Sequence, residues 1–354
     1  MTNLDFEGEG STGVHTIYSY PAKFIPQIPS FFIEKYKPSV VMDCFGGSAT
    51  TAVEAKRHGC QPIHVDIMPI SFALARVKCH EFSPRELHHT LVDLRIMLKV
   101  PKIDEAEDWM LPELVCHGKE GDYEYFKDEA IGEIMAVRDA IFKLDESPAK
   151  DFMRICAGQC LGRVASAIIQ ASHWEPDTHV IRTDFIKVFM DYASRMRNVF
   201  LKYYTQNPKF LNGKVPTIIN SSKRFSEALP PVDLVVTSPP YGKLVRVVNY
   251  PEMHKFTHLF FFDEPSPPPS AFIQSTAELD LYLDKWCGRV RPGGHCVVVV
   301  APSNSDDWVT ETRTILSRAG FSCVEDTERV IDPKQKYRPR QIKKEWVLDW
   351  VKKS

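Results

Sequence analysis

Four residues with the means to do chemistry follow an apolar run in the segment 234–242, which reads Leu-Val-Val-Thr-Ser-Pro-Pro-Tyr-Gly. The apolar run predicts a buried strand, and the two prolines must end it because proline cannot donate to a sheet ladder. Ser238 and the carbonyls of Pro239 and Pro240 then offer hydrogen-bond acceptors, while Tyr241 offers an aromatic face for stacking. The segment suits a flat heterocycle that carries an exocyclic amine. The alternative is a proline turn with a tyrosine packed beneath it.

A glycine turn between two acids stands earlier in the chain. Residues 40–43, Val-Val-Met-Asp, read as a strand, and Cys-Phe-Gly-Gly-Ser-Ala-Thr-Thr and a helical pattern follow. A second apolar strand ends in Asp66, which completes the order of a nucleotide-binding βαβ unit. Gly46 and Gly47 would let the backbone approach a ligand, and Asp66 is placed to accept hydrogen bonds from ribose hydroxyls. The motif falls short of G-x-G-x-x-G, so a tight turn without a ligand stays open.

Composition narrows the class of protein. The 354 residues are 44% hydrophobic and 25% charged, as in soluble globular proteins. With no apolar run of about 20 residues and no signal peptide, we expect a cytoplasmic protein. The net charge of −2 excludes a polycation, so a nucleic-acid footprint must be local. The nine cysteines are scattered, which favours reduced, mostly buried thiols and no metal site.

Helical patterns dominate the middle of the chain. Apolar stripes at helical spacing occupy residues 70–79, 126–144, 152–172 and 185–203, and the acidic stretch 104–129 reads as an exposed loop. We therefore expect a helical insertion between the second and third strands. Later strands are expected at 215–219, 234–236, 296–300, 321–325 and 346–351, with helices at 277–290 and 308–319.

Three motifs together resemble those of the S-adenosylmethionine-dependent DNA amino-methyltransferases. Tyr20-Pro-Ala-Lys-Phe resembles the family's cofactor-contacting N-terminal motif, and Asp43-Cys-Phe-Gly-Gly-Ser-Ala-Thr-Thr resembles its D-P-F-x-G-S-G-T-T loop. Thr237-Ser-Pro-Pro-Tyr resembles the catalytic motif of the N4-cytosine branch. The resemblance covers residues 15–79 and 214–351, which we expect to form the catalytic domain. It implies a Rossmann-like α/β methyltransferase sheet, mostly parallel with an antiparallel final strand, plus the helical insertion.

The cofactor that the resemblance implies is S-adenosylmethionine. Two positions depart from the family pattern. Ala49 replaces a usual third glycine, which is tolerable in helical φ/ψ but otherwise crowds the cofactor, and Asn220 replaces an acid near the adenine. The residues that the resemblance assigns to cofactor binding are Tyr20, Lys23, Phe24, Asp43, Phe45, Gly46, Gly47, Ser48, Thr50, Asp66, Asn220 and Thr237.

The activity that the resemblance implies is methyl transfer to the exocyclic amine of a DNA base flipped out of the duplex. The catalytic residues are then Ser238, Pro239, Pro240 and Tyr241. A serine before Pro-Pro-Tyr, rather than an acid or amide, favours cytosine N4. Three alternatives stay open: adenine N6 methylation, RNA guanine N2 methylation, and a non-catalytic nucleic-acid-binding subunit with the same fold.

Binding of DNA would involve two further parts of the chain. The insertion, residues 80–213, is a candidate target-recognition subdomain, and a cationic run near the C-terminus would clamp phosphates, unless it is a solvated hairpin tip. We expect DNA as the partner, with a cognate restriction endonuclease as a second one, in the cytoplasm and at the nucleoid. The predicted nucleic-acid-binding residues are Arg246, Lys334, Lys336, Arg338, Arg340, Lys343 and Lys344.

Overall fold

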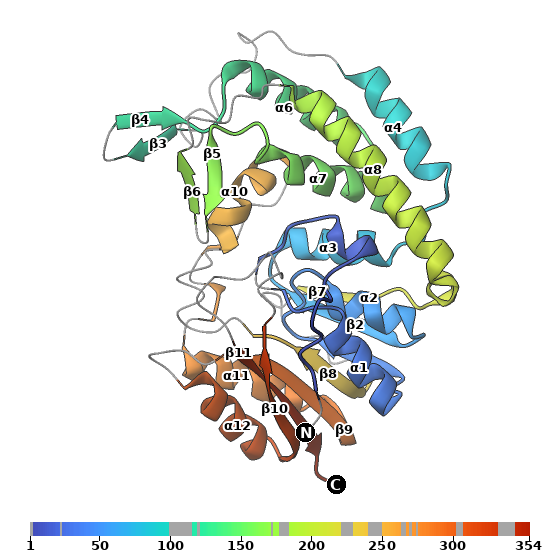
Figure 1. Cartoon of the computed structure of the whole chain (residues 1–354), viewed down its shortest axis with the longest axis vertical. Coiled ribbons are helices and arrows are strands. Elements are labelled where there is room, and N and C mark those ends of the chain that lie inside the picture. The colour runs from blue at the N-terminus through green and yellow to red at the C-terminus, as the bar shows by residue number, and fades with distance from the viewer. Residues whose placement is uncertain are drawn as a thin grey trace. The chain divides into compact units, whose positions relative to one another are not determined.

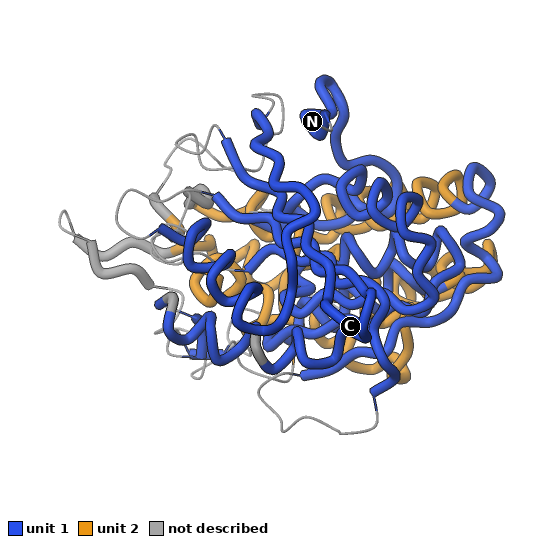
Figure 2. Tube along the Cα trace, turned by 90° about the horizontal axis from the view of Figure 1, so that it is seen from below, with its two compact units in different colours: residues 1–80, 204–248, 267–354 blue, residues 81–203, 249–266 orange. Residues whose placement is uncertain are grey.

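The chain forms two compact units, drawn in two colours in Figure 2. Unit 1 comprises residues 1–80, 204–248 and 267–354, and unit 2 comprises 81–203 and 249–266. A computed structural model describes residues 3–21, 23–98, 115–118, 121–170, 173–176, 184–220, 229–239, 250–262, 267–268, 271–273, 275–301, 307–331 and 344–354.

Unit 1 is built on a seven-stranded sheet in the order β10-β11-β9-β8-β1-β2-β7 (Figure 1). The final strand, β11, is antiparallel to both of its neighbours, and the other pairs are parallel. This order is Rossmann-like, because β1 lies inside the sheet, β2 and β7 follow it on one side, and β8 and β9 follow it on the other, all parallel to it. It confirms the predicted fold class. The strands are β1 Val40–Asp43, β2 Gln61–Asp66, β7 Thr217–Asn220, β8 Val232–Thr237, β9 Val290–Val300, β10 Phe321–Val330 and β11 Lys344–Lys352.

Helices cover both faces of this sheet because its central strands are apolar on both sides. On one face Leu234 and Val236 pack in a cluster with Phe32 and Ile33. On the other face Val235 packs in a cluster that includes Trp286 and Trp308. The helical elements of unit 1 are η1 Gly13–Thr16, α1 Gln27–Tyr36, α2 Thr50–Arg57, α3 Pro69–Cys79, η3 Pro208–Asn212, α11 Thr276–Cys287 and α12 Trp308–Arg318.

Unit 2 is mainly helical and has its own aromatic core. Phe126, Phe256 and Phe260 meet at ring-centroid distances of 5.1 to 6.5 Å, and Phe152 packs edge-on against Phe200. The unit also contains residues 249–266, which lie beyond the expected insertion 80–213. Its role in target recognition stays a prediction. Its elements are α4 Glu86–Met97, β3 Val115–Gly118, β4 Gly121–Glu124, α6 Asp128–Phe142, α7 Pro148–Leu161, β5 Ala167–Gln170, β6 His173–Pro176, α8 Phe185–Gln206 (whose last residues belong to unit 1) and α10 Tyr250–Phe261.

Several secondary-structure predictions for unit 2 were wrong. The stretch 104–129, expected as a loop, contains the hairpin β3–β4, and α4 was not expected at all. The helix expected over 152–172 ends at Leu161, and its last residues form strand β5, which pairs with β6. Short apolar runs fit a strand as well as a helix, so periodicity alone could not separate the two.

Two absences hold for the described part of the chain. None of its helices is long and apolar enough to cross a membrane. None of its His, Cys, Asp and Glu side chains gather in a group of three that could hold a metal ion. Of the eight cysteines whose side chains are described, all are free thiols and only Cys323 is exposed.

Candidate active site

Four polar residues that the sequence assigned to the cofactor end four neighbouring strands. Asp43 ends β1, Asp66 ends β2, Asn220 ends β7 and Thr237 ends β8. Asp66 lies opposite Asn220 in the register of β2 and β7, and all four strands run in the same direction. Open α/β sheets bind ligands at this carboxyl edge. The fold therefore gathers these side chains where a ligand is expected.

The Asp43 carboxylate joins the glycine turn to the strand that leads into Ser-Pro-Pro-Tyr. Its Oδ1 accepts hydrogen bonds from the Thr237 hydroxyl at 2.7 Å and the Phe45 N–H at 3.1 Å. Its Oδ2 accepts from the Thr51 hydroxyl at 2.8 Å. Asp43 is 1% exposed, and burial raises its pKa to about 6, although all three donors oppose that shift. Among the described residues Asp43 has hydrogen-bond donors but no ion-pair partner, so its carboxylate is buried there without a cation in contact.

Gly46 and Gly47 are needed by the packing of the protein itself. A Cβ on Gly46 would lie 2.2 Å from the His64 ring. Gly47 has φ +46°, and a Cβ there would lie 3.2 Å from the Tyr20 ring. The two glycines therefore have a structural reason that involves no ligand, and their role in making room for a cofactor stays a prediction.

Asp66 holds this turn and the start of the next helix together. Its Oδ2 accepts from the Gly47 N–H at 2.7 Å, and its Oδ1 accepts from the N–H groups of Ile67 at 2.7 Å and Met68 at 2.9 Å. Burial raises the pKa of Asp66, and these backbone hydrogen bonds oppose the shift. The predicted contact of Asp66 with ribose hydroxyls stays a prediction beside this positioning role.

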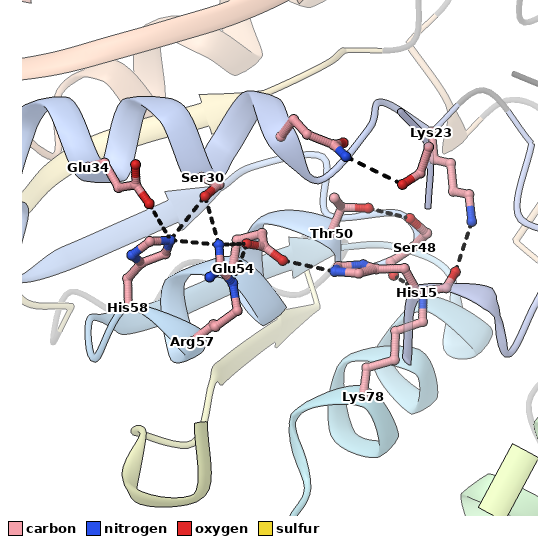
Figure 3. A network of polar contacts seen from close by, with 12 residues as sticks. His15, Lys23, Ser30, Glu34, Ser48, Thr50, Glu54, Arg57, His58 and Lys78 are labelled. Atoms are coloured by element: carbon pink, nitrogen blue, oxygen red, sulfur yellow. Dashed lines mark hydrogen bonds and ion pairs between the residues drawn. The ribbon is translucent and has the colours of Figure 1, made fainter. Parts of the chain in front are cut away.

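Two residues of α3 that sequence reasoning missed hold the carbonyl groups of the turn. The Ser71 hydroxyl donates to the Gly47 carbonyl at 2.7 Å and lies 2.9 Å from His64 Nε2. Lys78 Nζ donates to the Ser48 carbonyl at 2.6 Å (Figure 3). Both residues are 0% exposed. They are seven positions apart and therefore share a helix face, so a serine and a lysine on the apolar face of this helix were a usable signal.

Ala49 adopts the conformation of a glycine. Its φ of 61° and ψ of 29° lie in the left-handed region, so the right-handed helical geometry that would make alanine tolerable here is not present. Its N–H donates to the Gly46 carbonyl at 2.8 Å, which closes the turn. A Cβ in this region costs about 1–2 kcal/mol.

Two further turn residues, Ser48 and Thr50, are buried and lie with their hydroxyl oxygens 2.9 Å apart. Phe45 is half-buried and stacks on Tyr282 of α11, with ring centroids 5.1 Å apart. The backbone and side chains of the turn are thus fixed by contacts from α2, α3 and α11.

The N-terminal motif packs within unit 1. Tyr20 lies against Gly47, and Phe24 belongs to the cluster on the α1 face of the sheet. Lys23 Nζ donates to the His15 carbonyl at 2.9 Å, and burial lowers the pKa of Lys23 to about 8. Direct contact of Tyr20, Lys23 and Phe24 with a cofactor stays a prediction.

A buried polar network ties this N-terminal segment to α1 and α2 (Figure 3). His15 Nε2 lies 2.9 Å from Glu54 Oε1, and Arg57 Nη2 lies 2.7 Å from Glu54 Oε2. Arg57 also donates to the Ser30 hydroxyl at 2.7 Å. Burial alone would raise the pKa of Glu54, but His15 and Arg57 outweigh it and lower that pKa. The network fixes the elements that adjoin the glycine turn.

The Ser-Pro-Pro-Tyr segment is described as far as Pro239, which is buried, and Ser238 before it is half-buried. Pro240 and Tyr241 lie outside the described residues. Lys344 begins β11 and pairs with Glu328 at 2.6 Å. The other predicted phosphate contacts also lie outside the described residues: Arg246, Lys334, Lys336, Arg338, Arg340 and Lys343.

The fold and the strand-end residues define a Rossmann-like α/β protein whose candidate ligand site lies at the carboxyl edge of the sheet. Comparison with known proteins confirms the resemblance drawn from the motifs. The chain is 26% identical over 277 residues to the Type II methyltransferase M.MvaI of Kocuria varians, covering 69% of this chain and 56% of that protein. It is 33% identical over 90 residues to the Type II methyltransferase M.MjaII of Methanocaldococcus jannaschii, covering 25% of this chain and 17% of that protein.

The similarity covers only part of each of these two relatives. The chain spans about half the length of M.MvaI and less of M.MjaII, and no protein-family model matches it. Among solved structures, the rRNA methyltransferase aviRa of Streptomyces viridochromogenes aligns with a TM-score of 0.34 and 11% identity over 94% of this chain and 86% of that one.

Proposed function

We propose that this chain transfers a methyl group from S-adenosylmethionine to the exocyclic amine of a DNA base flipped out of the duplex. One relationship carries the proposal. The buried Asp43 carboxylate of the glycine turn accepts a hydrogen bond from Thr237, and Ser238, the next residue, begins Ser-Pro-Pro-Tyr. The glycine turn and the Ser-Pro-Pro-Tyr segment are therefore anchored to each other.

The residues present fit S-adenosylmethionine, which carries a sulfonium and an α-amino group as positive centres. Asp43 offers a buried carboxylate that forms no ion pair with any of the described residues, and such a group favours a cationic ligand. Asp66 and Asn220 end the two next strands and supply further polar groups at the same edge. We assign cofactor binding to this edge, with the turn 45–50 and Thr237 around it.

The reacting amine would be activated by acceptors rather than by a strong base. The lone pair of an amine conjugated to its ring is delocalised, which makes the amine a poor nucleophile. Ser238 Oγ and the Pro239 carbonyl would accept its N–H hydrogens and localise that lone pair. When bound, S-adenosylmethionine supplies an electrophilic methyl group on a positively charged sulfur. Tyr241 would stack on the flipped base and hold it in line.

The described part of the site contributes rigidity. Asp66, Ser71 and Lys78 hold the backbone of the glycine turn by hydrogen bonds of 2.6 to 2.7 Å. A site fixed before the reaction needs little reorganisation when the positive charge on sulfur is lost in the transition state. Positioning in a desolvated site would then supply much of the rate acceleration.

The base is assigned through the resemblance. Ser238 before Pro-Pro-Tyr favours cytosine N4, while the same acceptors would serve adenine N6. We further propose that the cations at 334–344 and Arg246 contact DNA phosphates, with unit 2 in target recognition. A cognate restriction endonuclease would be a partner in the same cell.

The test is incubation with duplex DNA and S-adenosylmethionine that carries a labelled methyl group, followed by digestion to nucleosides. Label in N4-methyl-2′-deoxycytidine is the expected result, and label in N6-methyl-2′-deoxyadenosine would move the assignment to adenine. Cofactor binding is measured in parallel by calorimetry. If the chain binds neither S-adenosylmethionine nor S-adenosylhomocysteine, with or without DNA, it is a non-catalytic subunit and the proposal fails.

A further inference from the structure

Two exposed arginines of unit 2 share one buried tyrosine ring. Arg163 follows α7 and Arg195 lies on α8, and their guanidinium carbons lie 5.0 and 4.9 Å from the centroid of the Tyr192 ring. Tyr192 is 5% exposed, whereas both arginines are exposed. Cations near a tyrosine ring are held by its quadrupole. The buried Tyr192 ring therefore holds two positively charged side chains close together at the surface.

Neither arginine has an anionic partner among the residues that the structure describes. Arg154 of the same unit shows the contrast, because it pairs with Glu146 at 3.1 Å and with Asp151 at 3.3 Å. Guanidinium groups are weakly hydrated and match phosphate oxygens in a two-pronged geometry. Two of them held near each other without a carboxylate make a place for an anion from outside the chain.

The surroundings extend the positive charge along α8. Lys187 and Lys202 are exposed on the same side of the helix as Arg195, at spacings of eight and seven residues. Together they span about 22 Å at a rise of 1.5 Å per residue, with Asp191 as the one acid on this stripe. A line of cations of this length fits an extended polyanion better than a single small anion.

We propose that Arg163 and Arg195 form a phosphate-binding site through which unit 2 contacts the backbone of duplex DNA. The choice of DNA as the source of the phosphate rests on the proposed function. Because Tyr192 holds both side chains in place beforehand, less conformational freedom is lost when the phosphate binds. Such a contact positions the duplex and carries no sequence information.

The test compares the 354-residue chain with the double variant Arg163→Gln, Arg195→Gln. Binding of a fluorescent 20-base-pair duplex is followed by anisotropy over a series of salt concentrations. We expect affinity at low salt to fall by about tenfold or more, and the slope of log K against log salt to become shallower by about 2, one for each phosphate contact. Arg163→Lys with Arg195→Lys should keep most of the slope, since the charges remain.

Arg85→Gln is the matched control, because Arg85 is an exposed arginine of the same unit at the start of α4. It should leave the slope unchanged, and an equal loss in this variant would reduce the effect to net charge and overturn the site. An unchanged slope in the double variant overturns it as well. So does tighter binding of duplex RNA than of duplex DNA, with the same dependence on both arginines.

The measurements separate an incorrect phosphate site at Arg163 and Arg195 from an incorrect proposed function. S-adenosylhomocysteine binding and thermal unfolding of the double variant should match the wild type, because both arginines are exposed and lie in unit 2. A wild type that methylates DNA and a double variant with an unchanged salt slope would remove this site and leave the activity. A wild type that does not bind duplex DNA removes both.

Discussion

The Thr237 hydroxyl donates a 2.7 Å hydrogen bond to the Asp43 carboxylate, and so links the last residues of β8 and β1. The two residues are 194 positions apart in sequence. Their strands are neighbours in the sheet and run parallel, which brings both strand ends to one edge. The glycine turn and the Ser-Pro-Pro-Tyr segment thus start from a common anchor.

Asp43→Asn should stabilise the protein at neutral pH while weakening cofactor binding. The pKa of Asp43 is about 6 in the folded protein against 3.8 for the free group, chiefly because of burial. Folding therefore favours the protonated carboxyl, and this stabilising contribution is lost as the pH rises from about 4 to about 6. The loss is about 3 kcal/mol. We expect the variant to gain up to that amount at pH 8 and to match the wild type near pH 3.

The measurement is urea unfolding between pH 3 and pH 8, with calorimetry of S-adenosylmethionine at pH 8. The amide can be accommodated because the Thr51 hydroxyl also reaches the Val236 carbonyl, at 3.2 Å, and can accept from the new NH₂ group. Asp307→Asn is the control, since the Thr310 hydrogen bonds lower the pKa of Asp307 and no gain at pH 8 is expected. A less stable Asp43→Asn at pH 8 would mean that the fold needs the charge.

Lys78→Met should weaken cofactor binding about tenfold, because the Ser48 carbonyl loses its donor and the glycine turn loosens. The change in unfolding free energy should be small, because two contributions oppose each other. An unsatisfied buried carbonyl costs about 1–3 kcal/mol, but removal of a buried amine offsets part of this. Calorimetry of S-adenosylhomocysteine gives the affinity.

Lys56→Met is the matched control for that experiment. Lys56 is also buried, donates to the Gly213 carbonyl at 2.9 Å and lies 4.9 Å from the Phe210 ring, away from the glycine turn. Its loss should disturb stability but leave cofactor affinity unchanged. Equal losses of affinity in both variants would show that the loss of any buried lysine lowers cofactor affinity, whether or not it contacts Ser48.

Ala49→Gly should raise the unfolding free energy by about 0.5–1 kcal/mol. The glycine removes the strain of a Cβ at φ 61°, and the greater freedom of glycine in the unfolded chain cancels part of that gain. Denaturant unfolding measures the difference. Ala52→Gly, in the right-handed helix α2 a few residues on, should instead lose about 1 kcal/mol. A loss in both variants would contradict the strain at position 49.

Ser238→Ala should lower turnover about 100-fold or more and leave cofactor affinity within about twofold. Removal of one positioned hydrogen-bonding group commonly has an effect of this size on the chemical step. Single-turnover methyl transfer to duplex DNA isolates that step. Unchanged turnover would leave the Pro239 carbonyl as the sole acceptor and remove Ser238 from the mechanism.

Tyr241→Ala should cut turnover strongly and largely spare cofactor binding, because the flipped base loses its stacking partner. Base–aromatic stacking contributes about 1–3 kcal/mol. Its removal should therefore lower turnover by a factor between about five and more than 100. Tyr241→Phe keeps the aromatic face and should retain most of the activity. If turnover falls equally in Tyr241→Phe and Tyr241→Ala, the hydroxyl rather than the ring is required.

Sequence reasoning recovered the parts of the fold that depend on local pattern. Runs of apolar residues placed β1, β2 and β8, and the turn at Gly46 and Gly47 follows from residue types that favour it. Unit 2 was harder to read, because short apolar segments such as Ala167–Gln170 suit a helix or a strand equally well. There the pairing with β6, and not local preference, decides the outcome.

What the sequence determined by itself is the order of strand, glycine turn and strand ending in an acid, and the proline-stopped strand after Asp233, because each is set by neighbours a few positions away. What only the tertiary structure decided is which of these residues meet. The Asp43–Thr237 hydrogen bond, the buried Lys78 at the Ser48 carbonyl and the left-handed Ala49 all depend on elements far apart in the chain being brought together. Burial is the physical reason: a polar group removed from water must find a partner, and only the packed fold determines which one is within reach.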